Sequence, residues 1–133
     1  MRDRSAVVIV ESNKVLLIKR TRKKAVYYVF PGGGIEQGET PEAAAEREAL
    51  EELGLKVKVR AKFAEVLFNG TQHYFIADIL AGILGSGQGE EYTDKGTDRG
   101  TYTPVWVGIE KLCTLDVRPQ EIAIQIKTCW EEK

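Results

Sequence analysis

Three glutamates at helical spacing are the side chains of this chain best suited to chemistry. Glu48, Glu51 and Glu52 occupy positions i, i+3 and i+4, so in a helix all three project from one side. Carboxylates held this close together repel one another, and a cation among them relieves the repulsion. The spacing therefore predicts a helix face that binds metal ions.

The composition restricts which metal these carboxylates could hold. His73 is the only histidine, and Cys113 and Cys129 are the only cysteines, far apart and without a C-x-x-C pattern. A zinc site built on histidine and cysteine is therefore not expected. Oxygen ligands favour a hard cation, so we predict Mg²⁺ or Mn²⁺ as the cofactor.

Clear signals mark both ends of the helix that carries the glutamates. Thr40 can cap it, Pro41 fits its first position, and Glu42 favours the positive end of its dipole. Gly54 suits the left-handed conformation that ends a helix. A glycine-rich turn, residues 31–34, precedes it and would let the backbone approach metal or phosphate closely. The predicted core face, on the side away from the glutamates, is Ala43, Ala49, Leu50 and Leu53.

The rest of the sequence mostly has the pattern of strands and hairpins. Residues 6–10 and 15–18 are apolar and β-branched, and the turn residues Ser12-Asn13 between them indicate a hairpin. Asn69-Gly70 indicates a second hairpin. Further strands are predicted at residues 27–30, 55–59, 63–68, 71–80 and 101–107.

Two segments are predicted as irregular, and the last element as a helix. Residues 19–24 have the composition of a basic linker, and residues 82–100 that of a long surface loop. A final helix is predicted to begin at Pro119. Strands and helices mix without strict alternation, so the fold class is α/β or α+β, with a mixed sheet between helices. No repeat or interdomain linker is present, which predicts one domain over residues 1–133.

Charge and hydropathy narrow the class of partner. The net charge is −1 and the sequence pI is about 5.9, so the chain lacks the basic field of duplex-binding proteins, and nucleic acid is not an expected partner. No apolar stretch approaches the ~20 residues that span a bilayer, so no membrane partner is expected. Few cysteines and no signal-peptide pattern are typical of a cytoplasmic protein with reduced thiols.

A longer pattern encloses the three glutamates. Gly33 is followed after five residues by Glu39 and after seven more by the run REALEELGL, residues 47–55. The pattern matches G-x5-E-x7-R-E-U-x-E-E-x-G-U at every charged and glycine position, with Ala49 a small choice for its first hydrophobic slot. This is the Nudix signature, so the chain resembles the Nudix hydrolases, and in length and layout their small MutT-like members.

The resemblance implies a role for each residue of the pattern. Glu48, Glu51 and Glu52 would bind the catalytic metals, and the main-chain carbonyl of Gly32 would be a further ligand. Glu39 would lie near that site. Arg47 would orient the glutamates, which also follows from its place between two of them on the helix surface.

Two questions about the site stay open at this point. Family members differ over the general base: some use the glutamate that matches Glu48, and others use a glutamate from a distant loop. Glu90 and Glu91 are the loop candidates here. Arg20 belongs to a basic run that either keeps the loop soluble or steers phosphate.

Aromatic residues outside the pattern could contact a nucleobase. His73 and Phe75 share one face of a predicted strand, where they either pack in the sheet or stack on a base. Tyr27 and Tyr28, just before the glycines, present the same two alternatives. We retain as candidate substrate contacts Arg20, Tyr28, His73, Phe75, Glu90 and Glu91.

The predicted function is metal-dependent hydrolysis of a pyrophosphate bond in a nucleoside di- or triphosphate or a nucleoside diphosphate derivative. The substrate signatures of the family do not fit well. The asparagine typical of oxidised-guanine enzymes is absent from residues 117–120, as is the proline of ADP-ribose enzymes from residues 70–72. Tyr74 lies slightly late for the tyrosine of dinucleoside polyphosphate hydrolases.

Two alternatives to this function remain. One is a nucleotide-sensing module on the same fold that does not turn over its ligand. The other is an enzyme that acts on triphosphorylated RNA 5′ ends. Small members of the family are often dimers, so a homodimer is a further expectation.

Overall fold

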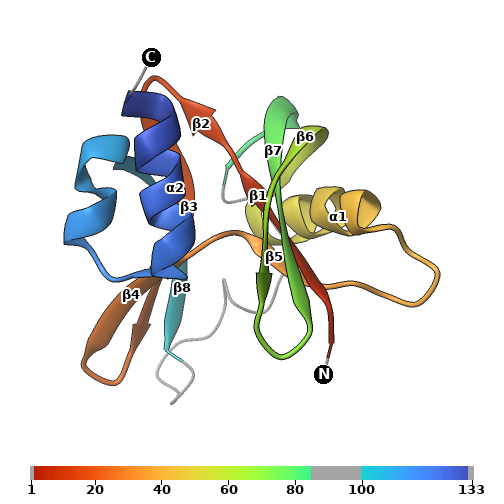
Figure 1. Cartoon of the computed structure of the whole chain (residues 1–133), viewed down its shortest axis with the longest axis horizontal. Coiled ribbons are helices and arrows are strands. Elements are labelled where there is room, and N and C mark those ends of the chain that lie inside the picture. Colours follow the sequence, from red (N-terminus) through yellow and green to blue (C-terminus); the bar gives the residue numbers. More distant parts are fainter. Residues whose placement is uncertain (1, 85–99, 132–133) are drawn as a thin grey trace. The chain divides into compact units, whose positions relative to one another are not determined.

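The computed structural model describes residues 2–84 and 100–131. The chain divides into two compact units, each described here by itself (Figure 1). The first unit comprises residues 1–9 and 31–89, and the second comprises residues 10–30 and 90–133. The arrangement is mixed α and β, as predicted, with the strands divided between two sheets. The single domain over residues 1–133 stays a prediction.

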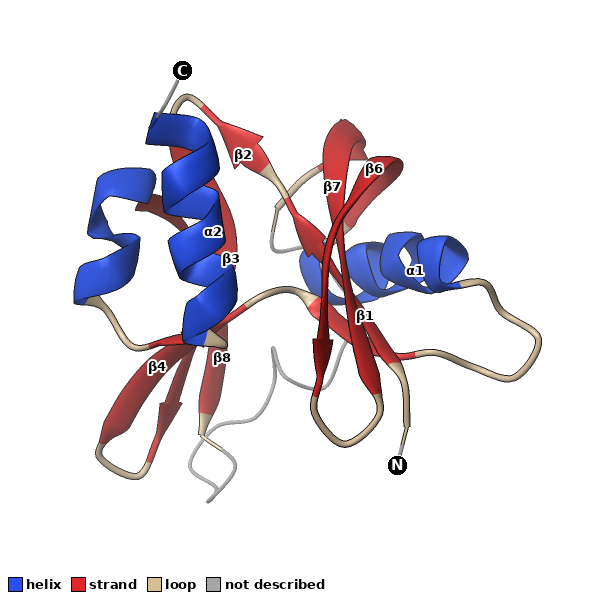
Figure 2. Cartoon of the chain, in the orientation of Figure 1, coloured by secondary structure: helices blue, strands red, loops and turns tan. Residues whose placement is uncertain are grey.

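The first unit is a four-stranded sheet on which one helix packs (Figure 2). The strand order is β5-β1-β7-β6, with β1 parallel to β7 and the other neighbours antiparallel. The elements are β1 (Arg4–Val8), β5 (Gly32–Gly34), α1 (Pro41–Leu53), β6 (Leu55–Leu67) and β7 (Thr71–Gly82). Helix α1 contacts β5, β1 and β6, so the sheet fixes where the helix glutamates stand.

The second unit is built around β3, which pairs with β8 along one edge and with β2 and β4 along the other. The 3₁₀ helix η2 joins β8 to β9, which pairs parallel to β4, and helix α2 follows. The elements are β2 (Val10–Glu11), β3 (Lys14–Arg22), β4 (Ala25–Val29), β8 (Thr101–Gly108), η2 (Ile109–Thr114), β9 (Val117–Arg118) and α2 (Gln120–Glu131).

Local chemistry correctly predicted the ends of α1 and the positions of two turns. The Thr40 side chain accepts a hydrogen bond from the Ala43 amide at 3.1 Å, and Gly54 ends the helix with φ of 74°. Ser12 and Asn13 both have positive φ between β2 and β3, the conformation of a tight hairpin turn. Asn69 likewise turns the chain between β6 and β7 with φ of 52°.

Several predicted boundaries were wrong. The glycine-rich turn is strand β5, paired with β1, and the basic linker is the end of β3 and its turn into β4. Residues 6–8 do not belong to the predicted hairpin; they pair with β5 and β7 instead. The two strands predicted at 55–68 are one strand, β6, with bulges that interrupt its periodicity.

The core face of α1 also differs from the prediction. Ala44, Ala45, Ala49 and Leu53 are buried, whereas Leu50 is 54% exposed and Ala43 is exposed. The glutamates therefore border the buried face instead of lying opposite to it. The two cysteines, Cys113 and Cys129, are both exposed. Among the described residues, no helix is both long and apolar enough to cross a bilayer.

Candidate active site

Helix α1 approaches strand β5 closely because the strand has no side chains. A Cβ atom on Gly33 would lie 2.4 Å from the carboxylate of Glu48, so only glycine leaves room for that carboxylate. The preceding glycine, Gly32, donates its backbone amide to Glu52 Oε1 at 2.6 Å. Two of the three predicted metal-binding glutamates are thus held directly against the glycine strand.

Arg47 links three of the acidic side chains to one another. Its Nε and Nη2 donate to the two oxygens of Glu39 at 2.7 and 3.0 Å, a bidentate pair. Its Nη1 donates to Glu48 Oε2 at 3.0 Å and to Glu51 Oε1 at 3.2 Å. Its Nη2 also donates to the Gly34 carbonyl at 3.0 Å. One guanidinium therefore orients three carboxylates and ties them to β5.

The carboxylates of this cluster have unlike electrostatic environments. The hydrogen bonds from Arg47 and from the Glu36 amide lower the pKa of Glu39 to about 2. Burial raises the pKa of Glu48 above its ordinary value, against the opposing effect of Arg47. The pKa of Arg47 is itself raised, chiefly by its hydrogen bond to Glu39. The pKa values of Glu39 and Glu48 are therefore shifted in opposite directions.

The donor atoms of the cluster suit a hard cation. Glu48, Glu51 and Glu52 offer carboxylate oxygens, and the glycine strand leaves space that a Cβ atom would fill. Within residues 2–84 and 100–131, no three acidic, histidine or cysteine side chains converge on a single metal position. The glutamates bond to Arg47 and to β5 instead, so binding an ion would require some of these carboxylates to turn.

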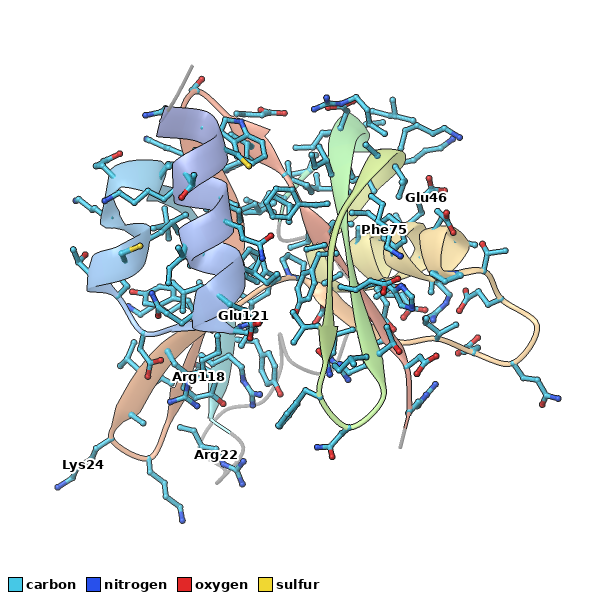
Figure 3. The ribbon with its side chains drawn as sticks, in the orientation of Figure 1. Arg22, Lys24, Glu46, Phe75, Arg118 and Glu121 are labelled. Atoms are coloured by element: carbon cyan, nitrogen blue, oxygen red, sulfur yellow. The ribbon has the colours of Figure 1, made fainter. Side chains whose placement is uncertain are left out.

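Arg20 lies in the second unit, within a layered cluster of arginine and tyrosine side chains. Its guanidinium is 3.9 Å from the ring centroid of Tyr102 and 5.6 Å from that of Tyr27. Arg118, which is labelled in Figure 3, lies over the same Tyr27 ring at 4.1 Å and forms a bidentate pair with Asp116. Such contacts fix the planes of both guanidinium groups.

Sequence reasoning missed Tyr27 and Tyr102 as neighbours of Arg20. Both are direct cross-strand partners of Arg20 in the register of β3 with β4 and β8, which a single sequence does not reveal. Tyr28 pairs with Lys19 and therefore points to the opposite face of the sheet. Arg20 and Tyr28 are thus not brought together, and Tyr28 lines a separate pocket of the second unit.

His73 and Phe75 do share one face of β7, as predicted. Their rings are nearly parallel, 11° apart, with centroids separated by 6.2 Å. Phe75 is 2% exposed, which favours the packing alternative over base stacking. His73 Nδ1 lies 3.6 Å from Glu65 Oε1, its cross-strand partner. The loop candidates Glu90 and Glu91 lie outside the described residues.

Glu46 is a second residue whose role the sequence did not indicate. The residue is labelled in Figure 3. Its carboxylate accepts a hydrogen bond from the Val59 amide at 2.9 Å, next to a bulge in β6. It precedes Arg47 on α1, so it anchors the helix to the sheet beside the carboxylate cluster. In the sequence, Glu46 is one more glutamate of an acidic helix, and nothing distinguishes it from its neighbours.

Comparison with known proteins places this cluster in a family. The NUDIX domain model matches residues 1–124. A Bacillus subtilis protein, provisionally named an 8-oxo-dGTP diphosphatase, is 38% identical over 79 residues, covering 57% of this chain and 52% of that protein. An RNA pyrophosphohydrolase of Blochmanniella pennsylvanica is 27% identical over 128 residues, covering 80% and 79%. The match thus spans about half the length of the Bacillus relative.

A solved structure supports the fold over the whole chain. A NUDIX hydrolase from Nitrosomonas europaea has a TM-score of 0.74 at 22% identity, covering 99% of this chain and 90% of that one. At this identity the likeness concerns the fold alone.

Proposed function

Because the chain belongs to the NUDIX family, we propose that it is a metal-dependent pyrophosphohydrolase. It would use water to cleave the phosphoanhydride bond of a nucleoside di- or triphosphate, or of a nucleoside diphosphate derivative. The observation that carries this proposal is the carboxylate cluster that Arg47 organises on α1 against the glycine strand.

Four groups would hold the metal ions. These are the carboxylates of Glu48, Glu51 and Glu52 and the main-chain carbonyl of Gly32. Mg²⁺ or Mn²⁺ bound there would neutralise phosphate charge and lower the pKa of the attacking water. The hydrogen bonds of Arg47 keep Glu48 and Glu51 oriented, and Glu39 in turn fixes the plane of the guanidinium.

Glu48 is our preferred general base. Its carboxylate lies against the glycine strand among the groups that would hold the metal ions, which would place it beside the attacking water. Glu90 and Glu91 remain the alternative bases. Replacing Glu48 with glutamine and following the pH dependence of kcat separates the two assignments, because a loop base would leave the acidic limb of the profile in place.

We propose a class of substrate and not a single compound. Two relatives are named as a diphosphatase of 8-oxo-dGTP and as a pyrophosphohydrolase of RNA, and both names fit the cleavage of a phosphoanhydride bond that we propose here. Arg20 is proposed as a substrate contact on the second unit, with its guanidinium plane held by Tyr102 and Tyr27. We also propose that the protein acts in the cytoplasm, with a homodimer as one expected state.

A second candidate activity is removal of pyrophosphate from triphosphorylated RNA 5′ ends. The observation in its favour is the match to an RNA pyrophosphohydrolase over 80% of this chain. Against it stands the net charge of −1, since RNA-binding surfaces are generally basic.

The test is a substrate panel at fixed Mg²⁺ with products identified by mass. The panel contains nucleoside triphosphates, oxidised dGTP, ADP-ribose, dinucleoside polyphosphates and 5′-triphosphorylated RNA. Release of phosphate, pyrophosphate or a nucleotide from any small nucleotide supports the first proposal, and turnover of RNA alone supports the second. Measurable nucleotide binding without turnover of any compound would make the protein a sensing module.

A further inference from the structure

Strand β1 carries a buried hydroxyl group next to the carboxylate cluster. Ser5 is 1% exposed, and no residue in the described part of the chain forms a hydrogen bond with its Oγ. A buried hydroxyl without a partner destabilises a fold, because it has lost its hydrogen bonds to water. A partner is therefore expected that the present arrangement of side chains does not supply.

The strand register places Ser5 beside the Glu48 carboxylate. Ser5 is directly opposite Gly33 in the antiparallel pair of β1 and β5. Directly opposite residues point to the same face of a sheet, with Cβ atoms about 4.5–5.5 Å apart. A Cβ atom on Gly33 would lie within 2.6 Å of both Glu48 carboxylate oxygens, so this is the face that α1 covers. The Ser5 side chain therefore points toward the space that Glu48 occupies.

No side chain of β5 separates Ser5 from Glu48, because Gly33 has none. Glu48 Oε2 accepts a hydrogen bond from Arg47 at 3.0 Å, and within residues 2–84 and 100–131 no donor bonds to Oε1. Binding an ion requires some carboxylates of the cluster to turn. Rotation about the side-chain bonds of Glu48 can then bring a carboxylate oxygen to the Ser5 hydroxyl without displacing another side chain of β5.

The other direct neighbour of Ser5 is His73, on β7. Its Nδ1 is also buried without a hydrogen bond, but it lies 3.6 Å from Glu65 Oε1 on β6. The strand order β5-β1-β7-β6 puts β6 and β1 on opposite sides of β7, so Nδ1 is directed away from Ser5. The imidazole also stacks with Phe75. Glu48 is therefore the partner that the geometry favours.

We propose that Ser5 is a positioning residue of the metal site, and that its hydroxyl donates a hydrogen bond to the Glu48 carboxylate when that carboxylate turns to bind an ion. The inference rests on the proposed function, because it takes Glu48 as a metal ligand. Ser5 is too deeply buried to touch a substrate, so it acts only through Glu48. Removing a hydrogen bond that orients a ligating side chain typically lowers metal affinity by about 10- to 100-fold.

The test measures Mn²⁺ binding to the full chain by calorimetry without substrate, and thermal unfolding in excess chelator. Ser5→Ala should weaken Mn²⁺ binding by about tenfold or more, because the hydroxyl no longer orients Glu48. The unfolding midpoint in chelator should stay the same or rise, because the variant loses a buried hydroxyl that has no partner. A purely structural hydroxyl would give the reverse, with unchanged Mn²⁺ affinity and a lower midpoint.

Further variants identify the partner of the hydroxyl. Thr103→Val is the matched control, because it removes an exposed hydroxyl from β8 of the second unit, and Mn²⁺ affinity should stay at the wild-type value. Glu48→Ala removes the proposed acceptor, so Ser5→Ala should cause no further loss of Mn²⁺ affinity in that background. His73→Phe removes the alternative partner, and Ser5→Ala should keep its full effect there.

Failure of this inference and failure of the proposed function are distinguishable. Wild-type Mn²⁺ affinity in Ser5→Ala, or an effect of Ser5→Ala that disappears in His73→Phe, would overturn the inference and leave turnover of nucleotides with Mg²⁺ untouched. A protein that turns over no compound of the panel but loses Mn²⁺ affinity in Ser5→Ala keeps the inference and loses the proposed function. Absence of Mn²⁺ binding to the wild type would overturn both.

Discussion

At the scale of single residues, Arg47 is the centre of the candidate site. It bonds to Glu39, Glu48 and Glu51 and to the Gly34 carbonyl, and these contacts need the planar fork of a guanidinium. A lysine can keep the charge but not the geometry. The orientation of the carboxylates therefore depends on one side chain that need not touch the substrate.

We expect Arg47→Lys to lower kcat by about 10- to 100-fold, as removal of groups that orient metal ligands usually does. Steady-state kinetics with Mg²⁺ measures the change. Arg60→Lys is the matched control, because the Arg60–Asp78 ion pair at 3.0 Å is exposed and lies outside the cluster. Near-normal kcat in Arg47→Lys would show that the guanidinium contacts do not position the reacting groups.

Glu51→Gln and Glu52→Gln should lower turnover more severely than Arg47→Lys, because each removes a predicted metal ligand. The amide keeps the size of the side chain, and Glu51 is 54% exposed, so the midpoint of thermal unfolding should change little. The control is Glu42→Gln, an exposed glutamate in the first turn of α1. Retention of normal Mg²⁺-dependent activity in either variant would contradict the site assignment.

The pair between Glu39 and Arg47 predicts a dependence of stability on pH. The pKa of Glu39 is about 2 in the folded protein, against an ordinary value of 4.5. Its contribution to stability is therefore complete above about pH 4.5 and is lost as the pH falls through 4.5 toward 2. Unfolding midpoints of the metal-free protein should fall over this range, and they should fall less in Glu39→Gln.

Equal slopes for the wild type and Glu39→Gln between pH 5 and pH 3 would contradict this assignment. Glu65 and Asp116 also have lowered pKa values, through Lys62 and Arg118, so the wild type loses stability there for several reasons. Only the difference between the two proteins reports on Glu39.

At the scale of elements, the decisive packing is that of α1 on β5. The helix places Glu48 and Glu52 against the strand. The strand has room for their carboxylates because its three residues are glycines. Glu46 bonds to β6 on the other side of the helix. The caps at Thr40 and Gly54 fix the helix ends between these two attachments.

Gly33→Ala should lower kcat by about 100-fold, the effect of displacing a reacting group by roughly 1 Å. The new methyl group would lie where the Glu48 carboxylate now lies, and that carboxylate would have to move. Gly34→Ala in the same strand is the control, because its Cβ would meet only the flexible end of Arg2. A similar effect in both variants would attribute the loss to the strand and not to Glu48.

At the scale of the whole molecule, the acidic cluster should couple metal binding to stability and activity. Excess chelator should abolish turnover, and Mg²⁺ or Mn²⁺ should restore it. A bound ion relieves repulsion among carboxylates that are clustered only in the folded chain, so it should raise the free energy of unfolding by RT ln(1 + [ion]/Kd), and the unfolding midpoint rises with it. Calorimetry with and without Mg²⁺ measures this, and activity that persists in chelator would indicate another chemistry.

The sequence predicted the local features of the molecule well. The caps of α1 and the hairpin turns at Ser12-Asn13 and Asn69-Gly70 follow from residue chemistry within a few positions. The pairing of Arg47 with carboxylates was also predicted, since residues at i and i+4 meet on a helix. The prediction from sequence was wrong where the pairing partner of a segment lies far along the chain. The glycine strand pairs with β1, and β1 pairs with β5 and β7 instead of forming a hairpin with β3.

The amino-acid sequence by itself determined the chemical class: an acidic helix and a spacing specific enough to indicate a family. Only the tertiary structure decided which way each carboxylate faces, that Arg20 lies between two tyrosines, and that Phe75 belongs to the core. The reason is physical. Helical spacing and capping act within a few residues, whereas strand register and burial depend on contacts between segments that no local pattern specifies.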